Sequence, residues 1–227
     1  NDEETKTLII NVEEKPTGEI MAGAGFGTSG TSTTFGVKEN NYLGNGLKLD
    51  AKLNLSEESV KGKLSIQNPN FNNSDKSIYV NVQSSETDKL TDSGYKTSKT
   101  GFTLGTNFEY YDDFFLGTSI NSYYESIETD STASSQQKKL KGNYFDNFLS
   151  LNFDLDKRNQ KFQTTQGFRN YFATDFPIIS ETNTLSNTLI LTNYFEYFEN
   201  HVLKSSFYFK NSNSISDKNI KLSERLY

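Results

Sequence analysis

The side chains that could do chemistry are few in this sequence, and their spacing suits no reaction. His201 is the only histidine, so a histidine-based triad would have to use it, and a lone histidine is more often structural. Asp154 and Asp156 are spaced like two ligands of a calcium loop, but the central glycine and the distal glutamate of that loop do not follow. The chain has no cysteine, which removes thiol chemistry and thiolate-bound metals. We therefore expect no catalytic residue, no metal site, no cofactor and no enzyme activity.

A glycine series near the N-terminus superficially resembles a loop that binds phosphate. It consists of Gly23, Gly25, Gly27 and Gly30. The Lys-Ser/Thr pair and the helical pattern that would follow such a loop are missing. Small residues in a closely packed strand explain the series better.

The composition favours extended structure with one polar side over an ordinary globular core. Hydrophobic residues make up 33% of the chain, below the ~45–50% usual for soluble domains. The 18 Phe and 13 Tyr are nevertheless more than a disordered chain would carry. The net charge of −6, with scattered Lys and Arg, gives no basic stripe for nucleic acid. Apolar runs are far shorter than the ~20 residues of a membrane-spanning helix.

Apolar and polar residues alternate along most of the chain after residue 18. The clearest case is 47–55, where leucines and one alanine alternate with Lys, Asp and Asn, followed by a similar strand at 60–67. About eleven strands of roughly ten residues are predicted, a length typical of strands that cross a bilayer. They are expected near residues 19–27, 31–40, 47–55, 60–67, 78–83, 101–109, 114–126, 149–155, 168–176, 187–198 and 203–209.

The connections between these strands favour a barrel with two different ends. Polar stretches at 86–99 and 128–146 predict long external loops, and most other connections predict short turns. The connection 156–167 is long on the side expected to have short turns. Aromatic clusters such as 194–198 suit an interfacial girdle, although the β-propensity of aromatic residues alone could place them there.

The predicted fold class is therefore all-β, an antiparallel transmembrane β-barrel. Bacterial single-chain barrels have even numbers of strands, so an odd count of eleven predicts the front part of a longer barrel. The chain also starts at Asn1 without an initiator Met, which predicts a fragment or a mature segment.

Four short motifs lie in order along the chain, and each is compatible with a turn between strands. The first ends at a Pro-Thr-Gly hinge, the second is Asn-Asn-Tyr-Leu-Gly-Asn-Gly, the third is Asn-Pro-Asn-Phe, and the fourth is Asp-Lys-Arg followed by Phe-Gln-Thr-Thr-Gln-Gly. Together they resemble the turn motifs of the BamA-type outer-membrane protein assembly factors, a POTRA-barrel family of bacterial surface antigens. The family usually has Tyr at the position of Asn70 and Pro at that of Gln163. The matching residues are Thr17, Gly18, Asn41, Leu43, Gly44, Gly46, Asn68, Pro69, Phe71, Asp156, Arg158 and Gly167.

The resemblance implies a domain organisation, a location and partners. Residues 1–17 would be the end of the last POTRA domain and a hinge, with a short strand near 8–12. Residues 18–227 would be the first part of the barrel, about eleven of sixteen strands. The location would be the bacterial outer membrane. The partners would be nascent outer-membrane proteins, outer-membrane lipid and, through the missing POTRA domains, accessory assembly lipoproteins, with no nucleic acid.

The resemblance also implies that the first strand of the barrel is the binding site. Family members fold and insert other barrels without nucleotide hydrolysis, and the first strand would open as a lateral gate that pairs with an incoming strand. Its small residues would weaken its pairing, although they could instead relieve crowding at the seam. The strand consists of Glu19, Ile20, Met21, Ala22, Gly23, Ala24, Gly25, Phe26 and Gly27.

Three alternatives remain open at this point. The chain could belong to a sibling of the same superfamily, either an autotransporter-assembly factor or a two-partner secretion pore. It could be part of a passive porin, in which Lys48, Lys52, Lys61 and Lys63 would face the lumen and set ion preference. It could also be a soluble β-rich binding module.

Overall fold

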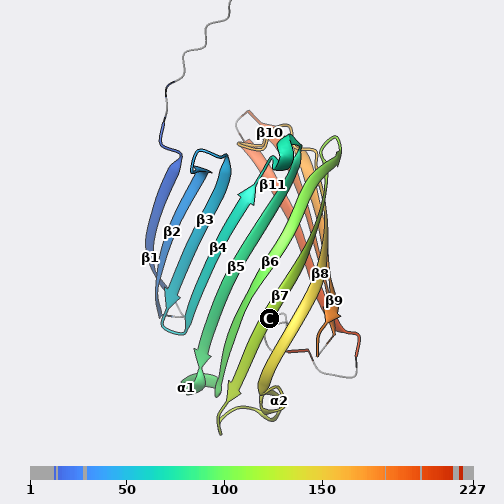
Figure 1. Ribbon diagram of the computed structural model, residues 1–227. Coiled ribbons are helices and arrows are strands. Elements are labelled where there is room, and N and C mark those ends of the chain that lie inside the picture. Colours follow the sequence, from blue (N-terminus) through green and yellow to red (C-terminus); the bar gives the residue numbers. More distant parts are fainter. Residues whose placement is uncertain are drawn as a thin grey trace, which may run out of the picture.

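The protein forms one curved antiparallel sheet in which every strand pairs with its neighbours in chain order (Figure 1). The computed structural model describes residues 13, 15–27, 30–181, 183–199, 201–216 and 220–221. Within this part the sheet has eleven strands, as the alternating pattern predicted. The expected strand at 8–12 lies outside the described residues. The strands are β1 (Gly18–Gly27), β2 (Gly30–Tyr42), β3 (Leu47–Ser56), β4 (Ser59–Asn68), β5 (Lys76–Lys89), β6 (Tyr95–Tyr111), β7 (Phe114–Thr129), β8 (Gly142–Asp156), β9 (Gly167–Ile179), β10 (Thr184–Phe198) and β11 (His201–Ser214).

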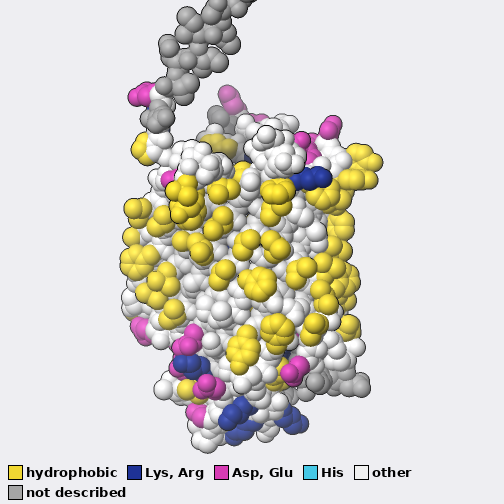
Figure 2. All heavy atoms as spheres, in the orientation of Figure 1, with side chains coloured by type: hydrophobic (Ala, Val, Ile, Leu, Met, Phe, Trp, Pro, Cys, Tyr) yellow, Lys and Arg dark blue, Asp and Glu magenta, His cyan; other side chains and the backbone are white. Residues whose placement is uncertain are grey.

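The two faces of the sheet have opposite chemistry. One face, called outward here, carries large apolar side chains that remain exposed, such as Val82 at 48% and Phe102 at 50%. These side chains lie opposite one another across successive strands because the register aligns the alternating patterns. One such row is Ile20, Val37, Ala51, Leu64, Val82 and Phe102. Figure 2 shows apolar side chains across the middle of the visible surface and most charges at its two ends.

The inward face is polar and is held together by hydrogen bonds between side chains. Thr103 on β6 donates to Asn121 on β7 over 2.7 Å, and Asn121 donates to Ser150 on β8 over 2.7 Å. Ser150 in turn donates to Asp175 on β9. A soluble domain would bury its apolar residues and expose its polar ones. This sheet does the reverse, which is the arrangement of a barrel wall with lipid outside and a polar lumen inside.

No helix in the described part of the chain is both long enough and apolar enough to span a membrane. The helices α1 (Leu90–Ser93) and α2 (Ser135–Lys138) have four residues each and lie in connections between strands.

The connections agree with the sequence-based expectation at one end of the sheet and differ at the other. The N-terminal end is the end where β1 starts, and the opposite end is called the far end. At the far end, β5 and β6 extend through most of the expected loop 86–99, which leaves only residues 90–94 unpaired. Likewise, the expected loop 128–146 shrinks to residues 130–141. At the N-terminal end, the connection after β8 is long, as predicted.

Charged side chains explain why these polar segments form strands. Lys96 lies 2.8 Å from Glu86 and 3.5 Å from Asp88 across the β5–β6 ladder. Lys89 lies 3.2 Å from Glu58. Cross-strand pairs of opposite charge stabilise a sheet where neither face is apolar. The strands β5 and β6 therefore continue beyond the band of outward apolar side chains, called the apolar belt here. In this extension, apolar and polar residues no longer alternate.

Candidate functional site: the first strand and its junction

Strand β1 lies at one edge of the sheet. It pairs antiparallel with β2 from Gly18 opposite Glu39 to Gly27 opposite Gly30, and its other edge pairs with no strand in the described part of the chain. In an antiparallel strand, alternate residues direct both N–H and C=O toward each side. The free edge of β1 is thus a row of backbone donors and acceptors available to another strand.

Side chains contribute little to holding β1 in place. Ile20 and Phe26 point outward and are 86% and 87% exposed. Met21 points inward over Gly36, where an added Cβ would lie 2.9 Å from the Met21 Cε. Every residue of β1 except Met21 is exposed, so backbone pairing with β2 is the main restraint.

Three glycines of β1, Gly23, Gly25 and Gly27, are not required by crowding against β2. A Cβ added at Gly23 or Gly27 would meet nothing within 4 Å, and one at Gly25 would meet only the Ser32 Oγ at 3.3 Å. A larger residue would therefore fit beside β2. Removing side chains from β1 mainly removes packing, which weakens the strand.

A hydrogen-bonded junction centred on Glu39 holds the start of β1. Glu39 Oε1 accepts a hydrogen bond from the Thr17 hydroxyl and another from the Asn41 N–H over 2.8 Å. The Asn40 N–H and side-chain amide donate to the Thr17 carbonyl over 3.4 and 3.3 Å. Gly18 lies against the same carboxylate, since an added Cβ would be 2.8 Å from Glu39 Oε2. The first two sequence motifs thus meet at one side chain.

The second and third motifs form tight turns at the N-terminal end. Leu43, Gly44 and Gly46 have positive φ angles of 57°, 71° and 67°, which glycine adopts at little cost. Asn41 closes this turn by accepting the Gly46 N–H at 2.7 Å. In the third motif, Asn68 accepts the N–H of Asn70 at 3.1 Å, which places Pro69 inside an Asn-initiated turn before Phe71. These residues shape the connections between strands.

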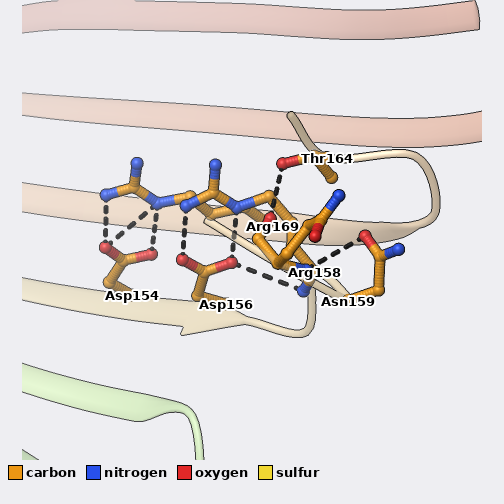
Figure 3. Close-up of polar contacts among 7 residues, drawn as sticks. Asp154, Asp156, Arg158, Asn159, Thr164 and Arg169 are labelled. Carbon is orange, nitrogen blue, oxygen red and sulfur yellow. Dashed lines mark hydrogen bonds and ion pairs between the residues drawn. The ribbon is translucent and has the colours of Figure 1, made fainter. Parts of the chain in front are cut away.

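The fourth motif contains two parallel ion pairs (Figure 3). Arg158 donates to both oxygens of Asp156 over 2.7 and 2.6 Å. Arg169 on β9 binds Asp154 on β8 in the same two-pronged way, with its shortest contact at 2.5 Å. Gly167 has a φ of 102°, and an added Cβ would lie 2.2 Å from the Lys157 carbonyl oxygen. The motif fixes a long turn through charge pairs and a glycine that no other residue can replace without strain.

A buried charge cluster lies at the far end of the inward face. The ammonium of Lys221 contacts Asp146 Oδ2 on β8 and lies 3.6 Å from Glu125 Oε2 on β7, and all three side chains are 0% exposed. Ser180 donates to the other Asp146 oxygen over 2.7 Å. Residues 220–221 therefore lie against the inward face, next to the apolar cluster of Ile127, Leu140 and Tyr144.

Within the described ranges, no group of three or more His, Asp and Glu side chains could hold a metal ion. His201 is exposed, and its Nδ1 lies 3.0 Å from the carbonyl oxygen of Glu199.

Comparison with known proteins identifies the family. The sequence profile of the Omp85 superfamily domain matches residues 41–227. This chain belongs to the Omp85 superfamily. Its fold is that of a solved BamA from Haemophilus ducreyi lacking POTRA domains 1–3, with a TM-score of 0.77 at 18% sequence identity over 93% of this chain. The chain covers 44% of that structure, so it spans less than half of its length.

The family recognition drawn from the motifs and the fold class drawn from the alternating pattern are thus confirmed. The motif search missed Glu39, which lies between two motifs and acts on both. The position of Glu39 opposite Gly18 in the β1–β2 register was the available signal. The search also missed Lys221, because no local pattern connects it with Glu125 and Asp146.

Proposed function

We propose that this chain is part of an outer-membrane β-barrel assembly factor, in which β1 forms a lateral gate and templates strands of other outer-membrane proteins. The observation that carries the proposal is the weak attachment of β1, which is joined to the sheet mainly by backbone pairing with β2. Adding a strand to an exposed edge is a known mode of recognition that depends on main-chain hydrogen bonds. Family membership and the BamA-like fold support the same assignment.

The organisation and surroundings belong to the same proposal. Residues 1–17 end a POTRA domain and form a hinge, and residues 18–227 begin the barrel. The protein lies in the bacterial outer membrane. Its partners are nascent outer-membrane proteins, lipid and accessory lipoproteins bound through POTRA domains. The apolar outward face supports the lipid contact, including a shallow groove of about 610 Å³ beside β1, whose lining includes Ile20, Phe35 and Leu64.

Site-specific crosslinking in the full-length protein tests the gate. Single cysteines replace Ala22, Gly23, Ala24 or Gly25, and a client protein carries a cysteine in its last strand. We expect crosslinks at several of these positions during assembly, because the client strand would lie one strand spacing, ~4.8 Å, from β1. A cysteine at Val82 on β5 is the control, since it is exposed on the outward face but lies in the centre of the sheet. Active assembly without crosslinks along 19–27 would refute the gate.

A sibling secretion pore of the same superfamily is the competing function. It predicts that the reconstituted protein moves an unfolded passenger across liposomes, whereas an assembly factor inserts barrels into the bilayer. The passive porin lies outside the family to which the chain belongs. Comparing passenger transport with barrel insertion in the same vesicles separates the two remaining functions.

A further inference from the structure

Three lysines form an unpaired positive patch on the inward face close to β1. Lys52 on β3 lies directly opposite Lys63 on β4, and Lys61 lies two residues before Lys63 on the same face. All three side chains are exposed, and none forms an ion pair within the described ranges. Their cross-strand neighbours are uncharged: Gly36, Asn54, Gln83 and Ser85. Lys52, Lys61 and Lys63 are called the lysine patch below.

The lysine patch places like charges next to one another with little compensating charge in the described sheet. Like charges placed directly opposite in a sheet are destabilising. The carboxylates nearest on the same inward face are Asp50 and Glu19. Asp50 lies two residues before Lys52 and also beside Lys38 and Lys48, and Glu19 lies opposite Lys38, so these two carboxylates are shared among more lysines than they can neutralise. Elsewhere on this face, Asp154, Asp156 and Asp146 already have cationic partners, and Asp175 lies on β9 and accepts a hydrogen bond from Ser150. A locally unfavourable arrangement without internal compensation is expected where a function requires it.

The surface between the lysine patch and the edge of β1 is open. On β1 the inward positions 23, 25 and 27 are glycines, and on β2 the inward positions 32, 34 and 36 are Ser, Thr and Gly. A Cβ added at Gly23 or Gly27 meets nothing within 4 Å. Met21 covers Gly36 in the row that leads to Lys52 and Lys63, but the next row runs from Gly23 across Thr34 and Asn54 to Lys61. A polypeptide segment that enters over Gly23 could therefore cross β1 and β2 and reach the lysine patch beside Met21.

We propose that the lysine patch binds the carboxylates of an extended acidic segment of the client chain while that client is paired at β1. The proposal rests on the proposed gate function. It adds that the lysine patch selects client segments with negative charge. Lysine is suited to this role because its flexible stem and point charge accept carboxylates in many registers. The lysine patch would contact the lumen-facing side chains of a client strand and would make no contact with its lipid-facing side chains.

Peptide binding to the full-length protein in nanodiscs tests the patch. The probe is a fluorescent peptide containing a client's last strand followed by an alternating Glu-Ser segment, and a second peptide carries Lys-Ser instead. The variant K52Q/K61Q/K63Q should bind the acidic peptide between about threefold and about a hundredfold more weakly, the range for three exposed ion pairs. The variant K52E/K61E/K63E should prefer the basic peptide, which shows that the altered protein is folded and can bind.

Matched controls decide between the outcomes. The variant K76Q/K139Q/K141Q removes three exposed lysines without ion pairs elsewhere in the described chain and should leave affinity unchanged. Equal affinity of the native protein for acidic and basic peptides, or an equal loss in the control variant, would overturn the proposal. Stronger competition by inorganic phosphate or anionic vesicles than by acidic peptide would also overturn it. Crosslinking at β1 measured in the same variants reports separately on the gate.

Discussion

At the scale of single residues, Glu39 links the segment that precedes the sheet to the first strand. Its carboxylate accepts from Thr17 on one side and from Asn41 on the other, so the position of residues 15–17 depends on the turn after β2. The interaction spans 22 residues of sequence. A displacement of residues 15–17 would therefore reach β2 through this side chain as well as through the backbone of β1.

We expect Glu39→Ala in the full-length protein to loosen the attachment of residues 15–17 to β2, where only the contacts of Asn40 with the Thr17 carbonyl would remain. Thr17 and Asn41 would lose their shared acceptor, whereas the β1–β2 ladder would remain. Limited proteolysis near Lys15 should become faster, with little change in the thermal stability of the barrel. Glu128→Ala removes an exposed carboxylate at the far end and should leave cleavage unchanged. Equal cleavage rates in Glu39→Ala and the native protein would contradict the role of Glu39.

A second prediction at this scale concerns the buried charges around Lys221. Lys221→Met leaves Glu125 and Asp146 buried without their cation, and breaking a buried pair in this way typically costs about 3–5 kcal/mol. The temperature at which the folded band disappears in semi-native electrophoresis should fall. Adding Glu125→Gln and Asp146→Asn to Lys221→Met should restore part of the stability. No recovery in the triple variant would show that lost packing, and not charge, sets the cost.

At the scale of elements, alternation predicted the strands well only where one face is apolar. Leu47–Ser56 was recognised almost to the residue because leucines repeat at every second position. The far halves of β5 and β6 were assigned to a loop, because both of their faces are polar beyond the belt. Their pairing depends on register and on Lys96, Glu86 and Asp88, which alternation does not reveal. Glu39 and Lys221 were missed for the same reason, since their partners lie 22 and 75 residues away.

The far-end connections pack against each other around Gly94. This residue has a φ of 72°, and an added Cβ would lie 2.4 Å from the Ala133 N and 2.6 Å from the Asp130 Oδ1. The Thr132 hydroxyl and N–H donate to Asp130 and hold the pKa of its carboxyl below the usual range. The tips of the β5–β6 and β7–β8 hairpins are thus one packed unit.

We expect Gly94→Ala to destabilise this unit by more than backbone strain alone. Gly44 is a matched control, because its φ of 71° is nearly the same but a Cβ there meets nothing within 4 Å. Gly44→Ala should cost about 1–2 kcal/mol from the left-handed conformation, and Gly94→Ala should cost more. Urea unfolding followed by tyrosine fluorescence measures both. Equal losses in the two variants would show that the tips do not pack.

At the scale of the whole molecule, the described sheet has two open edges, at β1 and β11. In hydrocarbon, unpaired backbone groups along an edge are costly, so a spanning sheet must close on itself. The H. ducreyi BamA of similar fold is more than twice as long as the aligned chain. We therefore expect closure to involve strands that this chain does not contain.

Refolding into lipid tests this expectation. Residues 1–227 alone should fail to give a compact, heat-modifiable band in semi-native electrophoresis, whereas a chain extended by the residues that follow Tyr227 in the gene should give one. A compact, protease-resistant band from residues 1–227 alone would contradict it and would point to closure between β1 and β11.

The strands differ in length, and β1 is among the shortest. It has 10 residues, whereas β5 to β8 have between 14 and 17. At ~3.3 Å per residue, β1 is about 33 Å long, which when tilted matches the apolar thickness of a thin bilayer. Backbone pairing at such an edge depends little on the sequence of the bound strand, but it does depend on the length of that strand. β1 would then select the length of the bound strand. It can pair with a segment long enough to cross the membrane, and it has no backbone groups for residues beyond that segment.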